Sequence, residues 1–334
     1  MLKIIYFRIT LIINSFLLIF QLWVMGVVVS FEASSTIPLV LPFLILVNLA
    51  FMVFWIVRRK WPFVLFLFAF LLSFREWKRF YKFPSNTIEV AKGLKVMSFN
   101  VRLFNLYQWK KEADIPQKIE AFIRQEAPDI LCIQEYALQE APAFSTYKYR
   151  FIKTSNARGN HGMALFSKFP LINTGQISFA SSSNSSIYAD FVYRNDTLRV
   201  YNVHLESLQL TLSDTLVSRT GSQRLLQRLG DIFDKQLEQL DRIAQNKNLN
   251  TLPSIVCADL NNTAFSKAYR TLKRGLQDSF EEKGKGLGAT YDLGLIPYRI
   301  DYIFADPRLK VLRHQTFDVN LSDHRPIAAD VVWR

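Results

Sequence analysis

The stretch that decides the fold is Asp129-Ile130-Leu131-Cys132-Ile133-Gln134-Glu135. Four consecutive apolar residues without alternation predict a short strand that is buried on both faces. The strand delivers Gln134 and Glu135 at its end. An ionised carboxylate at such a place is costly unless it is paired or bound to a metal. For Glu135 taken alone, the alternative is a strand-end carboxylate that lies in solvent.

Other apolar runs also end on polar residues. The run 94–99 ends at Asn100, the run 198–205 contains His204 near its end, and the run 254–258 leads to Asp259 and Asn261. Since Asp259 and Asn261 are two residues apart, an extended segment would place both side chains on one side. Taken alone, this pair also fits a turn, and a lone strand histidine also fits a structural role.

The C-terminal part supplies a carboxylate and a histidine. Asp301 opens the run Asp301-Tyr302-Ile303, and the motif Ser322-Asp323-His324 follows it. A carboxylate on one imidazole nitrogen fixes the tautomer and raises the basicity, so that the other nitrogen is left to act on water or phosphate. A hard cation such as Mg²⁺ takes oxygen ligands. We therefore expect Asn100 and Glu135, with Asp323 as a further candidate, to hold a metal.

Strands and helices are interspersed along residues 94–334. Apolar spacing predicts helices at 114–126, 223–244 and 265–272, with Asp114 as N-cap. Further strands are expected at 147–152, 162–167, 172–179, 187–194, 299–305, 311–319 and 326–332, and loops at 207–220 and 281–297. This pattern predicts an α/β sandwich of two packed sheets with helices outside.

The first quarter of the chain is far more apolar than the rest. Between residues 4 and 29 the only charge is Arg8, and between 37 and 57 there is none. Both runs reach the roughly 20 residues that cross a bilayer. We expect a transmembrane region at 1–82, a linker at 83–93 and a catalytic domain at 94–334. A buried helix hairpin and a cleaved signal peptide fit these lengths less well.

The third apolar run, 62–74, decides the topology. Basic residues place the N-terminus and the Arg58-Arg59-Lys60 loop in the cytoplasm. If the run crosses, the rest of the chain is extracytoplasmic; if it lies in the interface, the rest is cytoplasmic. Crossing is slightly favoured, which gives a multi-pass protein of the plasma (inner) membrane.

Composition adds two further constraints. The formal net charge of +13 suits anionic partners such as lipid headgroups, nucleic acid or phosphorylated substrates. Much of that charge flanks the apolar runs, where topology signalling explains it. The two cysteines, Cys132 and Cys257, lie inside apolar runs and are expected as buried core residues without a disulfide.

Six motifs in sequence order resemble the endonuclease/exonuclease/phosphatase superfamily. They are Ser98-Phe99-Asn100, Gln134-Glu135, Asn202-Val203-His204-Leu205, Asp259-Leu260-Asn261, Asp301-Tyr302 and Ser322-Asp323-His324. The resemblance implies a four-layer sandwich of two mixed sheets flanked by helices, and hydrolysis of a phosphoester with Mg²⁺, or alternatively Mn²⁺. Ala258 departs from the glycine that many members have before the aspartate.

The resemblance also implies residue roles. Glu135 would bind the metal, assisted by Asn100 and Asp323. Asp259 would position or activate water, while Asn261 binds phosphate. Asp301 would orient His324 as base or phosphate contact, and His204 would stabilise developing charge or protonate the leaving group.

Three functions remain open at this stage. The first is a membrane-tethered phosphodiesterase or phosphatase that acts on a lipid headgroup, with the bilayer as partner. The second is a nuclease, although the catalytic part shows no basic run interleaved with aromatic residues. The third is a binding protein without catalysis. No protein partner, substrate identity or oligomeric state can be inferred from the sequence.

Overall fold

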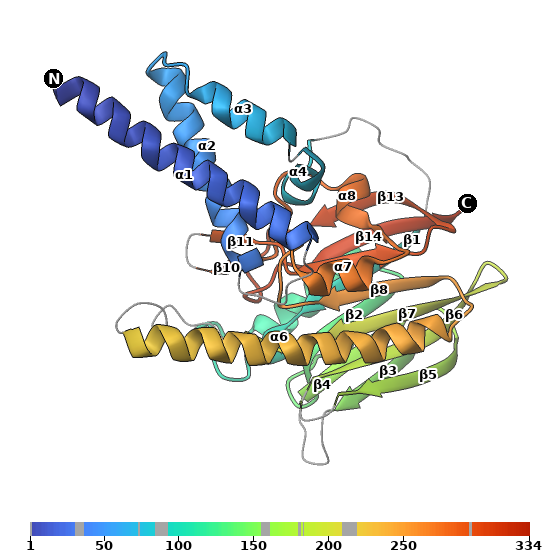
Figure 1. Cartoon of the computed structure of the whole chain (residues 1–334). Coiled ribbons are helices and arrows are strands. Elements are labelled where there is room, and N and C mark those ends of the chain that lie inside the picture. Colours follow the sequence, from blue (N-terminus) through green and yellow to red (C-terminus); the bar gives the residue numbers. More distant parts are fainter. Residues whose placement is uncertain are drawn as a thin grey trace.

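The computed structural model describes residues 2–30, 37–72, 74–83, 93–154, 161–179, 182, 184–208, 219–293 and 296–334. Two six-stranded sheets pack face to face, and helices cover their outer faces (Figure 1). The predicted α/β sandwich is therefore confirmed.

The first sheet has the strand order β13-β14-β1-β2-β4-β3. Its strands are β1 (Leu94–Asn100), β2 (Ile130–Ala137), β3 (Tyr149–Thr154), β4 (His161–Ser167), β13 (Leu309–Thr316) and β14 (Ile327–Trp333). Only β1 and β2 pair in parallel in this sheet, with Asn100 opposite Gln134. The parallel pair brings the carboxyl ends of two strands to one edge.

The second sheet has the order β5-β6-β7-β8-β12-β9. Its strands are β5 (Leu171–Ser178), β6 (Ser185–Tyr193), β7 (Asp196–His204), β8 (Ser254–Asp259), β9 (Gln277–Asp278) and β12 (Asp301–Ala305). Strands β7 and β8 are parallel, with His204 opposite Asp259. Strand β12 runs antiparallel to β8 and places Asp301 opposite the same Asp259. Both sheets are thus mixed, as expected.

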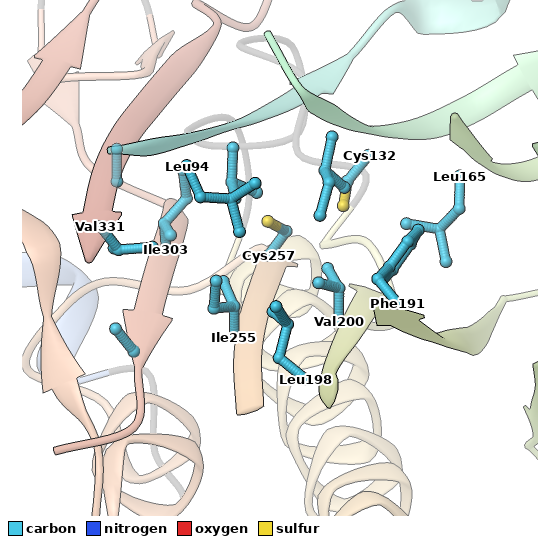
Figure 2. Packing of buried hydrophobic residues seen from close by; sticks show 14 of the residues in the cluster. Leu94, Cys132, Leu165, Phe191, Leu198, Val200, Ile255, Cys257, Ile303 and Val331 are labelled. Atoms are coloured by element: carbon cyan, nitrogen blue, oxygen red, sulfur yellow. The ribbon is translucent and has the colours of Figure 1, made fainter. Parts of the chain in front are cut away.

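Apolar side chains from both sheets form the central core. Figure 2 shows Leu94 and Cys132 of the first sheet facing Cys257, Val200 and Phe191 of the second. Both cysteines are buried and free, as the sequence predicts. Because strands in this layer are covered on both faces, their sequences are continuously apolar.

Helices fill the outer layers. Helix α5 (Ile115–Glu126) buries Ile115, Ile119 and Ile123, at helical spacing, against the first sheet. Helices α6 (Arg219–Asn248) and α7 (Lys267–Lys273) cover the second sheet. Asp114 is the N-cap residue of α5, as predicted, but its side chain makes no capping hydrogen bond and its carboxylate pairs with Lys118.

The prediction of a loop at 281–297 is wrong in part, because this stretch contains regular structure. It contains the end of α8 (Ser279–Lys283) and the hairpin strands β10 (Tyr291–Leu293) and β11 (Ile296–Tyr298). Asp278 caps α8 by accepting a hydrogen bond from Phe280 N. Four glycines in the stretch pointed to a loop, but long-range contacts order it.

The N-terminal helices lie beside the sandwich, with the N-terminus at their far end (Figure 1). They are α1 (Leu2–Ser30), α2 (Ile37–Val57), α3 (Phe63–Leu72) and α4 (Phe74–Phe80). In the described part of the chain, two of them are long and apolar enough to cross a membrane. Val24 of α1 and Leu41 of α2 pack with Phe80 of α4 and with Phe265 of the sandwich. Of the predicted linker 83–93, residues 84–92 lie outside the described residues.

Candidate active site

Strand ends from both sheets meet at one end of the sandwich. The register places Asn100 beside Gln134 in one sheet. In the other sheet, Asp259 lies between His204 and Asp301. Hydrogen bonds then link the sheets, since Asn100 Nδ2 donates to Asp259 Oδ2 over 2.9 Å. Residues far apart in the sequence therefore form one polar cluster.

Asp301 and His324 form a buried pair. The Asp301 Oδ2 atom lies 3.0 Å from His324 Nδ1. Burial raises the pKa of Asp301 to about 6, although His324 opposes this shift. Burial alone would lower the pKa of His324, but the carboxylates of Asp301 and Asp259 outweigh it and raise the pKa to about 10. The imidazole is thus held protonated at neutral pH, and its second nitrogen is a hydrogen-bond donor.

Asp259 is the centre of the cluster and is fully buried. Its carboxylate lies 3.7 Å from His204 Nε2 and 3.8 Å from His324 Nδ1. Asp259 Oδ1 accepts a hydrogen bond from Asn261 N at 3.0 Å. Two histidines, the Asn261 backbone N–H and the Asn100 side-chain amide thus surround a carboxylate that has no direct Lys or Arg partner in the described chain.

Asn261 does not continue an extended segment, contrary to the sequence argument. Its φ of 49° is left-handed, and Asn261 Nδ2 donates to Leu205 O at 3.1 Å. Asparagine tolerates this conformation better than most residues. A turn, rather than strand alternation, brings Asn261 beside Asp259.

Glu135 sits on a bulge, so β2 does not end there as expected. The strand continues to Ala137, and its register against β4 shifts between Ile133 and Tyr136. Glu135 has a φ of 51°, and Asn100 Nδ2 donates to Glu135 Oε1 at 3.1 Å. Bulges commonly re-aim a side chain near active sites. Here the bulge turns Glu135 toward a cleft.

Asn100 presents its amide nitrogen, not its oxygen, to Glu135 and Asp259. Its Oδ1 accepts a hydrogen bond from Arg102 N at 3.0 Å. In this arrangement Asn100 orients the two carboxylates. Its expected place as a metal ligand would use the remaining lone pair of Oδ1, and stays a prediction.

His204 is buried, and its Nε2 atom has no hydrogen-bond partner among the residues that the structure describes. This nitrogen lies 3.9 Å from Glu135 Oε1. A buried polar atom without a partner is unusual in a folded protein. Its position between two carboxylates fits a site that binds a further group.

Asp323 and His204 line the same cleft. Asp323 accepts from Ser322 Oγ at 3.2 Å and pairs with Arg102 Nη1 at 3.2 Å. All eight predicted site residues are therefore at one end of the sandwich. The pairing with Arg102 was not foreseen.

The donor chemistry fits a hard divalent cation. Glu135, Asp259, Asp301 and Asp323 supply carboxylate oxygens around the cluster, and such oxygens are the ligands of Mg²⁺. Among the described residues, Asp259, Asp301 and His324 hold ligand atoms within 4.8 Å of one another. This group differs from the predicted ligand set of Asn100, Glu135 and Asp323.

Three supporting residues lay inside the motifs but had no assigned role. Gln134 Nε2 donates to Asn202 Oδ1 at 2.7 Å and to Ser98 Oγ at 3.0 Å. The bond to Asn202 crosses from the first sheet to the second, whereas the bond to Ser98 stays within the first sheet. Thr290 was missed entirely: its Oγ1 accepts from the backbone N–H of Ile300 and Asp301. A glycine-rich neighbourhood gave no signal for that contact.

Comparison with known proteins agrees with this architecture. Residues 97–324 match the model of the Endonuclease/Exonuclease/phosphatase family. No curated protein sequence matches the chain. Among solved structures, an endonuclease/exonuclease/phosphatase from Bacteroides vulgatus has 18% identity, covers 73% of this chain and 100% of its own, and has a TM-score of 0.58.

Two other solved structures carry functional names. A mannosyl-6-phosphatase from Bacteroides thetaiotaomicron has 17% identity, 72% and 100% coverage, and a TM-score of 0.55. The human Nocturnin catalytic domain with bound sulfate has 19% identity, 73% and 94% coverage, and a TM-score of 0.54. At such identities these structures show a shared fold. Together with the match over residues 97–324, the fold shows that the chain belongs to the endonuclease/exonuclease/phosphatase family.

Proposed function

We propose that the chain is a membrane-anchored, metal-dependent phosphoesterase that hydrolyses the phosphoester of a lipid headgroup. The observation that carries the proposal is the buried Asp301–His324 pair, which faces Asp259 beside Glu135 and His204. Members of the family are generally phosphoric ester hydrolases, which agrees with this chemistry.

The metal would be Mg²⁺, with Mn²⁺ as a substitute, held by Glu135 with Asn100 and Asp323. When bound, such an ion neutralises negative charge on a phosphate and lowers the pKa of water. Glu135 suits this place because its bulge directs a partly exposed carboxylate into the cleft. The Asp259, Asp301 and His324 group is a poorer position, because a protonated His324 has no lone pair to offer an ion.

The remaining residues divide the reaction between them. His324 is held protonated by Asp301, so it donates a hydrogen bond to a phosphate oxygen rather than acting as the base. Asp259 is the acceptor that positions water, and Asn261 contacts phosphate. His204 Nε2 supplies a donor for the leaving group or the developing charge. Every predicted catalytic position therefore holds a side chain that is chemically suited to its role.

The membrane anchor is supported by where apolar side chains lie. Most of the exposed large apolar residues in the described chain fall within residues 2–74. Polar residues of the same helices point inward: Asn48 Nδ2 donates to Gln21 Oε1 at 2.9 Å, and Trp55 Nε1 donates to Asn14 Oδ1 at 3.0 Å. Apolar surface outside and hydrogen-bonded amides inside is the pattern of helices packed in lipid.

The arrangement of these helices supports an extracytoplasmic catalytic part. Helix α1 ends, and α2 begins, on the side of the sandwich, because Met25 and Leu44 join the cluster that includes Phe265. The N-terminus and the Arg58–Lys60 loop lie at the opposite end (Figure 1). Basic residues mark the cytoplasmic end. Helices α3 and α4 would then return the chain across the membrane, which places the sheets outside the plasma (inner) membrane.

The contacts of the β10–β11 hairpin support the proposal of a lipid substrate. Strand β11 contacts helix α2, while Tyr291 of β10 forms a backbone bridge to His324, with ring centroids 5.2 Å apart. The hairpin therefore touches both a membrane helix and the catalytic histidine. A headgroup that protrudes from the bilayer would need to travel only a short way to reach the site.

The test uses the full-length protein in detergent micelles with Mg²⁺ or Mn²⁺. Substrates are phospholipid vesicles, sphingomyelin, inositol phosphates and plasmid DNA. We expect lipid hydrolysis, and we expect Asp259→Asn and His324→Ala to abolish it without lowering the thermal unfolding temperature substantially. Asp196→Asn, at an exposed hairpin, is the matched control. Cleavage of DNA alone would show a nuclease, and no hydrolysis of any ester would refute catalysis.

Topology is tested separately by cysteine labelling. Lys111→Cys lies on an exposed loop of the catalytic part and Arg59→Cys on the loop between α2 and α3. A membrane-impermeant maleimide should label position 111 in intact cells, and position 59 only after permeabilisation. The reverse pattern would place the catalytic part in the cytoplasm.

A further inference from the structure

A cleft of about 400 Å³ extends from the catalytic cluster. Glu135, His204 and Asp323 of the catalytic cluster line the cleft. The lining also includes the charged or aromatic side chains of Arg102, Trp109 and His161. The mechanism above uses none of these three, and the volume exceeds what one phosphate occupies. The cleft therefore has room for a part of the substrate next to the scissile phosphate.

An unusual backbone turn fixes Arg102 at this place. The four residues Arg102–Asn105 all have left-handed φ angles, between 45° and 66°. Non-glycine residues in this region each cost roughly 1–3 kcal/mol, and such strain gathers at functional sites. The turn is held at both ends, because Asn100 Oδ1 accepts from Arg102 N and Asn105 Oδ1 accepts from Lys110 N.

Two neighbours orient the Arg102 guanidinium. Its Nη1 lies 3.2 Å from Asp323 Oδ2, and its Cζ lies 4.3 Å from the centre of the Trp109 ring. The Arg102 side chain keeps about a third of its surface exposed (36%). A flat guanidinium stacked on an aromatic ring loses little further freedom on binding an anion. Because one ring face already carries a positive charge, the same aromatic ring is a poor site for a quaternary ammonium group.

We propose that Arg102 and Trp109 form a subsite for a second anionic group, a phosphate adjacent to the scissile one. This inference rests on the proposed function, since it assigns the substrate class of the same site. Arginine binds phosphate through paired hydrogen bonds of fixed geometry. The preferred headgroups are therefore those with a further phosphate, and zwitterionic choline headgroups are disfavoured.

The test measures binding as well as turnover. Isothermal titration of the full-length protein in maltoside micelles compares inorganic pyrophosphate with phosphocholine. Wild type should bind pyrophosphate at least about tenfold more tightly than phosphocholine, because one charge-assisted hydrogen bond contributes that much affinity. Arg102→Gln should bring the two affinities within about threefold, and Arg102→Lys should keep part of the preference. Arg124→Gln, an exposed arginine on α5, is the charge-matched control and should keep the wild-type ratio.

The outcomes separate the two proposals. Equal affinities in wild type, or an unchanged ratio in Arg102→Gln, would overturn the subsite while phosphate binding still supports the phosphoesterase. Binding of neither probe would overturn both. Trp109→Leu gives a second line of evidence: it leaves the charge in place and should weaken pyrophosphate binding less than Arg102→Gln does. A larger loss in Trp109→Leu would show that the ring, not the guanidinium, makes the subsite.

Discussion

Replacing Asp301 with Asn tests the electrostatics of the catalytic pair. The pKa of His324 is raised from 6.5 to about 10. This difference of ~3.5 units corresponds to ~5 kcal/mol in favour of the imidazolium. Of the two carboxylates, Asp301 raises the pKa of His324 more, from a distance of 3.0 Å, and Asp259 raises it further from 3.8 Å. Asparagine keeps an acceptor near Nδ1 but removes the charge, so we expect the pKa of His324 to fall by roughly two units or more.

The assay is the pH profile of kcat/KM on bis(4-nitrophenyl) phosphate between pH 5 and pH 10. A protonated His324 is required in the proposed reaction, so wild-type activity should persist to the alkaline end of this range. In Asp301→Asn the alkaline limb should move toward neutral pH, so activity at pH 9 should fall by about tenfold relative to wild type, while activity at pH 7, where His324 stays mostly protonated, should fall less. Asp196→Asn should leave the profile unchanged. An alkaline limb that stays in place, or activity at pH 9 within about threefold of wild type, would refute this account of the pair.

Three further predictions follow from other parts of the structure. Chelation with EDTA should lower the thermal unfolding temperature of wild type but not of Glu135→Gln, because the variant lacks the proposed metal ligand; equal shifts would exclude Glu135 as a ligand. Arg299 Nη1 lies 2.7 Å from Oδ2 of the buried Asp278. Arg299→Met leaves this carboxylate without its charge partner, so it should lower the free energy of unfolding by about 3–5 kcal/mol in denaturant unfolding. A loss below about 1 kcal/mol would contradict this prediction. Burial lowers the pKa of His314 to about 4, so the unfolded chain binds more protons between about pH 6.5 and pH 4. The free energy of unfolding should therefore fall by about 3 kcal/mol as the pH is lowered from about 6.5 to about 4. In His314→Gln this fall should be absent.

Several elements could be predicted because their cause is local. Continuous apolar runs such as Ile130–Ile133 mark strands that are covered on both faces, and helical spacing marks α5. Polar residues end several of these runs, and the carboxyl ends of parallel strands meet at one edge of a sheet. The structure brings these polar residues together, with Asp259 between His204 and Asp301.

Other features depend on contacts that no local pattern contains. The hairpin β10–β11 forms inside a glycine-rich stretch because Tyr291 pairs with His324 and β11 packs on α2. Thr290 joins the site because its Oγ1 accepts hydrogen bonds from the backbone N–H groups of Ile300 and Asp301. Such bonds join residues whose sequence separation carries no periodic signal.

By itself the sequence determined the two-sheet sandwich, two apolar helices long enough to cross a membrane, and the residues that gather at the strand ends. These follow from the hydrophobicity and period of short segments. Only the tertiary structure decided how Glu135, Asn261 and Arg102 are aimed, since each has a left-handed φ that its residue type does not demand. Such strained conformations persist because surrounding contacts hold them, and those contacts exist only once the chain has folded.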